Sequence, residues 1–280
     1  MNMLSKLFKP LTKTVAGAVL TVGIVSSAFS ASPPFTVTPA GIGEIQAPFV
    51  ANQINGTSSE LLTLAPGPNT FTGVGWVNFS AFVNNGSNVG AGTSGLNLGP
   101  GTLGYQMYLT FSLAGSLSSG TFGAPNSNYN LSSLNFTLRA DPNNNTTFTQ
   151  ANAATSTSAT VGGILGDDIT LGNGSLIVGV AGFDALFGAF LNSTQSYANT
   201  AAGNLFFTSP SPFYNIAFDA FNNTSQGVVV NGNLISITNA AGVVDFNRVQ
   251  VPEPESLGLL GIGLLGLVAG LRRRKAKVVA

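Results

Sequence analysis

The sequence predicts an all-β domain, an antiparallel sandwich or jelly-roll-like fold, flanked by an N-terminal signal helix and a C-terminal transmembrane helix. Apolar and polar residues alternate with period two in several segments, including residues 105–113 (YQMYLTFSL) and 134–138 (LNFTL). This alternation is typical of half-buried strands. No helical heptad pattern persists between the two ends of the chain. The other segments with strand-like patterning are residues 71–83, 176–180, 213–221 and 228–237.

Turn-forming dipeptides separate these segments, because Asn-Gly, Gly-Pro and Pro-Gly steps supply the backbone angles that tight turns need. Two longer stretches, residues 87–101 and 143–159, are rich in Gly, Asn, Ser, Thr or Ala, and we expect them to form surface loops. The turns are expected at Asn55-Gly56, Gly67-Pro68, Asn85-Gly86, Pro100-Gly101, Asn173-Gly174 and Asn231-Gly232.

The chain is unusually poor in charge. Only 7% of its 280 residues are charged, against roughly 25% in an average soluble domain. Hydrophobic residues make up 44%, so a core can still form. Eight of the ten basic residues lie near the two ends, which leaves Arg139 and Arg248 against eight acidic residues between Ser32 and Arg248, a net charge of −6. A mildly acidic middle argues against nucleic acid as a partner, since that needs a basic face.

The N-terminus has the layout of a secretory signal peptide. Three lysines precede the apolar residues 15–25 (VAGAVLTVGIV), and small residues follow. This run is too short for a spanning helix, which needs roughly 17–25 residues. We therefore expect residues 1–30 to be a signal peptide that signal peptidase removes after Ser30, with Ala28 and Ala31 as acceptable neighbouring cut positions.

The C-terminal tail, residues 249–277, has three parts. The motif Val251-Pro252-Glu253-Pro254 precedes fifteen apolar residues, 257–271 (LGLLGIGLLGLVAGL), and the basic cluster Arg272-Arg273-Arg274-Lys275. The prolines favour an extended backbone that a processing enzyme can bind. The basic cluster is expected to hold the tail at the cytoplasmic face of the membrane. The apolar run is short for a permanent span unless flanking residues help.

This tail resembles the PEP-CTERM sorting signal of exopolysaccharide-producing bacteria in all three parts, their order and their spacing. The resemblance implies that an exosortase recognises Pro252-Glu253-Pro254 and processes the chain near it. The membrane would then hold the chain only transiently. We expect export across the inner membrane, transient anchoring, and final placement at the cell surface or in the extracellular matrix.

The predicted domain, residues 31–248, also resembles the flocculation-associated PEP-CTERM proteins. That resemblance implies an exported protein that supports floc or biofilm formation together with extracellular polysaccharide. Arg139 stands where a β-type residue is expected. The segments that carry the resemblance are residues 51–56 (ANQING), 61–64 (LLTL), 103–108 (LGYQMY), 136–143 (FTLRADPN), 166–168 (GDD) and 209–214 (SPSPFY).

The residue types argue against an enzyme. The chain contains no cysteine and no histidine, which excludes a Ser-His-Asp triad and a Cys-His pair. A carboxylate pair acting on a glycan stays formally open, but isolated acids beside Gly and Asn are more often turn residues. We expect no enzymatic activity and no cofactor. The carboxylates concerned are Glu44, Glu60, Asp141, Asp167, Asp168, Asp184, Asp219 and Asp245.

A calcium site is a weaker alternative. Asp141, Asn143 and Asn145 have the spacing of the first three ligands of a calcium loop. Thr146 stands where such a loop needs glycine, and Asn152 where it needs a bidentate glutamate. Asp167 and Asp168 add carboxylates, although neighbours on a strand point to opposite faces. The simpler interpretation is a turn after the strand at residues 134–138.

Carbohydrate binding through aromatic rings is the main alternative to a structural role in the matrix. Sugar faces stack on exposed rings, but most tyrosines here alternate within strands and are expected in the core. Tyr129 and Tyr197, in polar surroundings, are the better candidates for exposed rings. An aligned, exposed platform would favour a carbohydrate-binding module with a specific glycan ligand, and buried rings would favour the matrix role. The candidate rings are Trp76, Tyr105, Tyr108, Tyr129, Tyr197 and Tyr214.

Overall fold

The computed structural model describes residues 32–98, 104–222 and 227–248. All of them belong to one of the two units into which the chain divides, residues 31–280. This part is mostly strand. The strands are β1 (Phe35–Val37), β2 (Phe49–Ala51), β3 (Gln53–Ala65), β4 (Thr70–Asn84), β5 (Ser87–Asn88), β6 (Gln106–Ser119), β7 (Ser127–Asp141), β8 (Thr147–Thr149), β9 (Thr160–Gly162), β10 (Ile169–Phe183), β11 (Ala189–Asn199), β12 (Phe207–Ser209), β13 (Ile216–Asn222), β14 (Val228–Asn231) and β15 (Leu234–Asn247). The short helices are η1 (Pro39–Ile42), α1 (Ala91–Ser94), η2 (Ala153–Thr155) and α2 (Ala201–Phe206).

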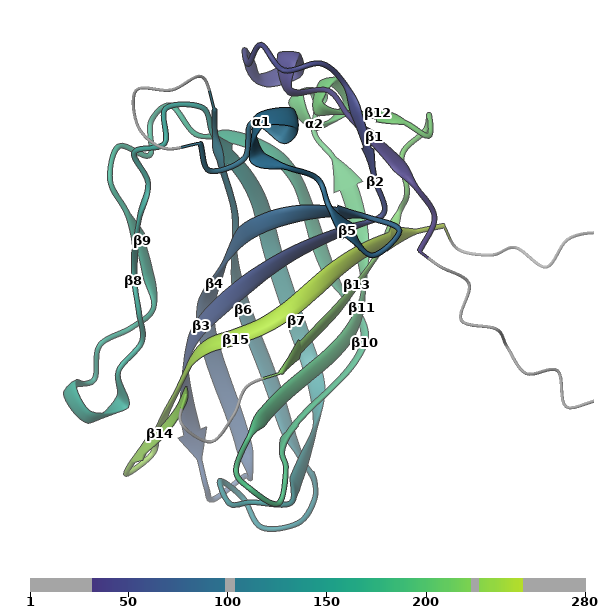
Figure 1. Cartoon of the computed structure of the whole chain (residues 1–280). Coiled ribbons are helices and arrows are strands. Elements are labelled where there is room, and N and C mark those ends of the chain that lie inside the picture. Colours follow the sequence, from purple (N-terminus) through teal and green to yellow (C-terminus); the bar gives the residue numbers. More distant parts are fainter. Residues whose placement is uncertain (1–31, 99–103, 223–226, 249–280) are drawn as a thin grey trace, which may run out of the picture. The chain divides into compact units, whose positions relative to one another are not determined.

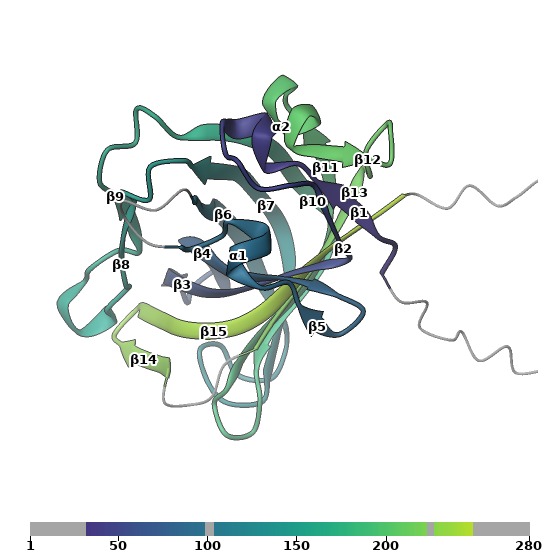
Figure 2. The same ribbon diagram turned by 45° about the horizontal axis from the view of Figure 1, so that its top comes forward.

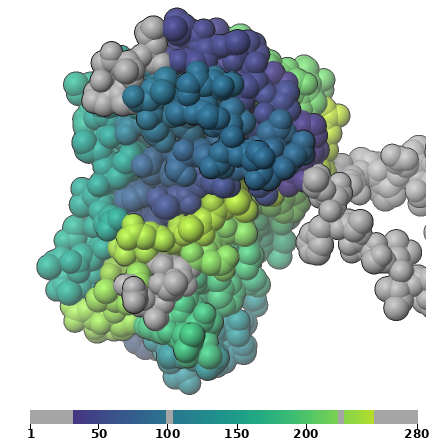
Figure 3. Space-filling view, in the orientation of Figure 1, coloured from purple at the N-terminus to yellow at the C-terminus, as the bar shows by residue number. Residues whose placement is uncertain are grey.

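The main sheet closes on itself (Figure 1). Its strands follow the order β13-β11-β10-β7-β6-β4-β3-β15, and β15 pairs in turn with β13, so eight antiparallel strands form a ring. The all-β, antiparallel prediction is confirmed. The prediction of a sandwich or jelly roll is wrong, because the two edges of a single sheet meet through seven residue pairs between β13 and β15, from Ile216↔Asn247 to Asn222↔Ala241. In the space-filling view β15 and β3 run side by side across one face (Figure 3).

The period-two pattern separates the two faces of this sheet. On β6, Leu109 and Leu113 belong to the buried core, whereas Thr110 and Ser112 lie on the outer face. The predicted strands at 71–83, 105–113, 134–138, 176–180 and 213–221 correspond to β4, β6, β7, β10 and β13, mostly with longer bounds. The segment 228–237 is instead a hairpin of β14 and β15, which turns at the predicted Asn231-Gly232 step.

Two predicted turns lie within strands. Asn55-Gly56 is part of β3 and Asn173-Gly174 is part of β10. Glycine is required at both positions because there is no space for a Cβ. A Cβ on Gly174 would lie 2.1 Å from Cε1 of Phe136, and one on Gly56 would lie 2.8 Å from the carbonyl oxygen of Asn78. Asn85-Gly86 does form the predicted turn, with φ values of 49° and 82°. Pro100-Gly101 lies outside the described residues.

A layer of short elements covers one end of the ring (Figure 2). It contains the small sheet β12-β1-β2 together with η1 and α2. Aromatic rings from this layer pack on the end of β15: the ring centroids of Phe35 and Phe246 lie 5.5 Å apart, and those of Phe213 and Phe246 lie 5.2 Å apart. The core therefore continues from the inside of the ring into this cap.

The excursion between β7 and β10 packs on the outer face of the ring. Its β8–β9 hairpin places Phe148 against Trp76 of β4, with ring centroids 5.0 Å apart. The indole Nε1 of Trp76 donates a hydrogen bond of 2.9 Å to the carbonyl oxygen of Thr149. The predicted loop at 143–159 therefore contains β8 and η2, and the described part of the predicted loop at 87–101 contains β5 and α1.

Within the described ranges, no helix is long and apolar enough to cross a membrane. The predicted signal helix and the predicted apolar helix at 257–271 both lie outside those ranges.

Candidate functional site

The residues of the predicted processing signals lie outside the described part of the chain. They are the cleavage residues Ala28, Ser30 and Ala31, the motif at 251–254 and the basic cluster at 272–275. Arg248 directly follows β15 and is the last of the described residues. Its Nη2 donates to the carbonyl oxygen of Pro212 at 2.9 Å, and its guanidinium carbon lies 5.8 Å from the ring centroid of Tyr214. The last described residue is thus held against the segment that leads from the cap into β13.

Asp141 ends β7 and organises the turn that follows it. Its Oδ1 accepts the backbone N–H of Asn143 at 2.9 Å, and its Oδ2 accepts those of Asn145 at 2.7 Å and Thr146 at 2.8 Å. The side chain is fully buried. Three donors to one carboxylate make a strong, charge-assisted cap of the turn. The predicted turn after this strand is confirmed.

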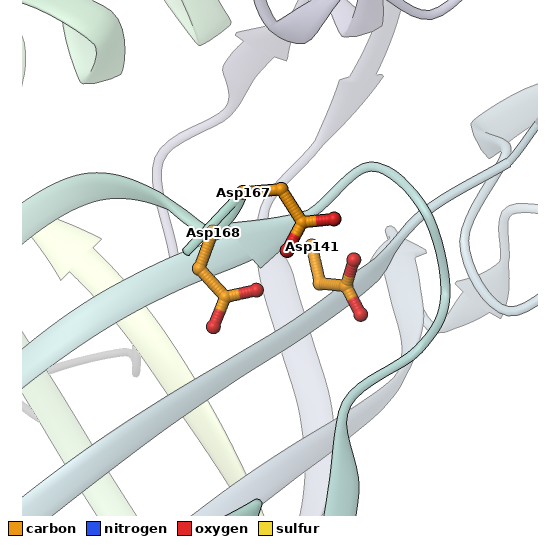
Figure 4. Close-up of side chains that lie close together, drawn as sticks. All are labelled: Asp141, Asp167 and Asp168. Carbon is orange, nitrogen blue, oxygen red and sulfur yellow. The ribbon is translucent and has the colours of Figure 1, made fainter. Parts of the chain in front are cut away.

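Asp167 and Asp168 converge on Asp141 (Figure 4). One carboxylate oxygen of each residue lies within 4.8 Å of the others. Opposite orientations were expected for neighbours on a strand, and that expectation is wrong because both residues precede β10, which begins at Ile169. The side-chain amides of Asn143 and Asn145 donate to Oδ2 of Asp167 at 2.5 and 3.0 Å, and these hydrogen bonds lower the pKa of Asp167.

Asp168 is in a different environment. The hydroxyl of Tyr108 donates a short hydrogen bond to its Oδ2, and Oγ1 of Thr146 lies 3.5 Å from its Oδ1. Burial raises the pKa of Asp168. The same surroundings, burial first and then the bond to Asp168, raise the pKa of Tyr108 above its ordinary range. Asp167 therefore ionises more readily than Asp168.

The cluster offers the oxygen ligands that Ca²⁺ prefers. Oδ1 of Asn145 and Oδ1 of Asp167 are buried and accept no hydrogen bond. However, Asp141 is already saturated by backbone donors, and Asn143 presents its amide nitrogen to Asp167. Asp141, Asp167 and Asp168 are thus the residues that could hold a cation, and the first two also have hydrogen-bond partners within the turn without one.

A second pair of acids lies inside the ring. Glu60 of β3 and Asp219 of β13 both line one interior cavity of about 30 Å³. Burial raises the pKa of each carboxyl group to about 7. Nε2 of Gln195 donates to Oδ2 of Asp219 at 2.5 Å, which offsets part of that effect. A cavity of this size admits a water molecule but no sugar residue.

Two of the remaining candidate acids, Asp184 and Asp245, have local roles. Oδ1 of Asp184 accepts the backbone N–H groups of Leu186 and Gly188 and closes the turn between β10 and β11. Asp245, on the outer face of β15, accepts the hydroxyl of Ser32 at 2.8 Å. Burial raises the pKa of Asp245 and that of Glu44.

All six candidate aromatic side chains are buried. Tyr129 and Tyr197, which were expected to be exposed, are each only 4% exposed. Both point into the ring, where Tyr129 packs edge-on against Phe71 and Tyr197 stacks on Phe136. Phe218 on β13, which the sequence reasoning missed, is 39% exposed. The alternation in segment 213–221 could have predicted this exposure, because Phe218 lies between inward-facing Ala217 and Asp219.

Comparison with known proteins identifies the tail. The model of the PEP-CTERM protein-sorting motif matches residues 250–275, so the predicted sorting signal is confirmed. The motif implies an exported protein that is anchored through a C-terminal sorting signal and processed by an exosortase. No curated protein and no solved structure matches the chain.

Proposed function

We propose that this chain is a non-enzymatic protein of the extracellular polysaccharide matrix, which is released at its sorting motif and supports flocculation or biofilm formation. The observation that carries the proposal is the PEP-CTERM motif at residues 250–275. Signal peptidase removes residues 1–30, an exosortase acts near Pro252-Glu253-Pro254, and the membrane holds the chain only between these steps. The domain then remains at the cell surface or in the matrix.

Two features of the domain support a matrix role over the alternatives. The candidate rings for a carbohydrate-binding module are buried, at 9% exposure or less, so they cannot stack on a sugar. For a glycan-acting enzyme, two carboxylates must face a substrate-sized cleft. Glu60 and Asp219 face a cavity of only about 30 Å³, and Asp141 is committed to its turn.

The test replaces Pro252, Glu253 and Pro254 by alanine in the producing bacterium and follows chain size, location and flocculation. We expect a chain that has lost residues 1–30 but keeps its C-terminal tail and stays in the membrane fraction, and a culture that flocculates less. Glu255→Ala is the matched control, since it removes the neighbouring charge but leaves the motif intact. Normal processing and release of the triple-alanine chain would refute the sorting step.

A separate measurement tests the matrix role. A strain that lacks the gene is compared with the same strain carrying the wild-type gene, and the protein is assayed in washed polysaccharide. We expect the wild-type protein to co-purify with the polysaccharide and restore flocculation. A correctly processed protein that stays in the medium, without effect on flocculation, would refute the matrix role and leave the sorting step intact.

A further inference from the structure

An uncharged polar surface covers part of the outside of the ring. Adjacent outward residues on β6, β7 and β10 form two rows across the strands: Thr110, Thr137 and Asn173 in one, and Ser112, Asn135 and Ser175 in the next. Ser196 of β11 extends the second row. All of these side chains are polar and none is charged, whereas an ordinary protein surface is about 25–35% charged residues.

The surface is hollowed between β6 and β7. A trough of about 320 Å³ is lined by Thr110, Ser112, Asn135 and Thr137, together with Phe111 and Phe136. Ser112 and Asn135 are exposed, and the two threonines are half-buried. We call this feature the outer trough. Its volume falls within the range of small-ligand sites, which is about 300–1,000 Å³.

The hydrogen-bonding groups of the outer trough are largely unused. Among the described residues, the side chains of Ser112, Asn135 and Thr137 make no hydrogen bond. Thr110 accepts one from Nη1 of Arg139 at 3.0 Å and keeps its own O–H free to donate. Neighbouring strands are about 4.8 Å apart, and successive outward residues along a strand are about 6.8 Å apart. Donors and acceptors therefore repeat in two directions, along the strands and across them.

The charges around the outer trough select against a polyanion. Arg139 lies at one end, in the next row along β7, beside Tyr108 and Thr170. The positive charge of Arg139 interacts electrostatically with Asp168, which belongs to the cluster of three aspartates. One cation beside three carboxylates leaves that end net negative. A ligand with many hydroxyl groups and no charge is not repelled by these carboxylates, and its binding does not require the desolvation of a charged group on the ligand.

We propose that the outer trough binds a neutral polysaccharide chain, which lies across β6, β7 and β10 and exchanges hydrogen bonds with Thr110, Ser112, Asn135 and Thr137. The inference rests on the proposed association with extracellular polysaccharide and assigns that association to one face of the ring. Such a contact is weak per sugar and gains strength along the chain, as multivalent binding does. It needs no exposed aromatic ring.

The test measures retardation of the purified exported protein in native gels that contain polysaccharide from the producing culture, dextran, or alginate. Dextran is neutral and alginate is polyanionic. The variant is Thr110→Val with Thr137→Val, which removes both hydroxyl groups at nearly constant shape. The matched control is Thr57→Val with Thr63→Val, two exposed outward positions on β3. Circular dichroism and thermal unfolding confirm that each variant folds.

We expect the culture polysaccharide and dextran to retard the wild type and the control, and alginate to retard them less. The trough variant should bind about 10-fold more weakly or worse, because the two hydroxyl groups account for about one hydrogen bond each. Equal retardation of trough variant and wild type would overturn the assignment to the trough and leave polysaccharide binding intact. Stronger retardation by alginate would overturn the preference for a neutral chain. Absence of retardation by the culture polysaccharide would refute the trough and the proposed matrix association together.

Discussion

Glu60 inside the ring makes the stability of the fold depend on pH. Its carboxyl group has a folded pKa of about 7, against an ordinary value of 4.5, because ionisation in the interior is opposed by burial. Below about pH 4 the group is protonated in the folded and the unfolded chain, and its burial does not lower the free energy of unfolding. As the pH rises towards 7, the unfolded chain ionises first, so the free energy of unfolding falls. Above about pH 7 the loss is complete.

The size of this effect follows from the two pKa values. A shift from 4.5 to about 7 corresponds to about 3 kcal/mol, since each pKa unit is worth about 1.4 kcal/mol. Glu60→Gln removes the titration and keeps the shape. The stability of the variant relative to the wild type should therefore rise by about 3 kcal/mol between pH 4 and pH 8, or by about 6–12 °C in Tm for a domain of this size.

Urea unfolding of the purified exported protein at pH 4, 6 and 8 measures this difference. Comparing the stability difference at pH 4 with that at pH 8 cancels any constant cost of the glutamine side chain. Leu62→Met, a volume-conserving change of an inward neighbour on β3, is the control, and its pH profile should run parallel to that of the wild type. A stability difference between Glu60→Gln and wild type that is the same at all three pH values would refute the reasoning, because Glu60 would then ionise equally well in both states.

Two further predictions concern the turn and the strands. Asp141→Ala should lower the free energy of unfolding by about 3 kcal/mol, because it removes the acceptor of three backbone N–H groups. This cost should be the same in chelator as in calcium. A rise of the wild-type Tm with calcium that Asp167→Asn abolishes would instead place a cation in the aspartate cluster. Gly174→Ala should cost about 1–3 kcal/mol or more through steric overlap with Phe136, whereas Gly67→Ala, with open space around its Cβ, should be nearly neutral. Equal unfolding free energies for the two glycine variants would contradict the packing argument.

Local patterns predicted what depends on local structure. The strand-like alternation at residues 105–113 and the turn at Asn85-Gly86 follow from side-chain spacing and backbone preference, and both appear in the structure. Closure of the sheet does not follow from them, because it depends on the pairing of β13 with β15, although β14 lies between these two strands in the chain. A sandwich and a closed sheet can have the same alternation, since each has one buried and one outer face.

The misread features have the same origin. Asn173-Gly174 has the composition of a turn, but the glycine is needed because Phe136 of the neighbouring strand occupies the space beside it. Tyr197 sits among polar residues in sequence and yet points inward, because Gly172 leaves room for its ring: a Cβ there would lie 2.5 Å from the Tyr197 hydroxyl oxygen. Asp167 and Asp168 reach Asp141 only because the excursion through β8 and β9 returns to the end of β7. Each outcome depends on a residue more than twenty positions away.

Closure also explains how so little charge is tolerated. An open sheet exposes unpaired backbone groups at its edges, and soluble proteins commonly protect such edges with lysine or other charged residues. Between Ser32 and Arg248 this chain has no lysine. The pairing of β13 with β15 removes the two long edges instead, which leaves the outer face free of the need for protective charge. Part of that face is therefore built from Ser, Thr and Asn, whereas Val178, Val180 and Phe218 are exposed elsewhere on the strands. The uncharged surface of the outer trough is thus a consequence of the closed sheet as well as the basis of its proposed affinity for a neutral polysaccharide.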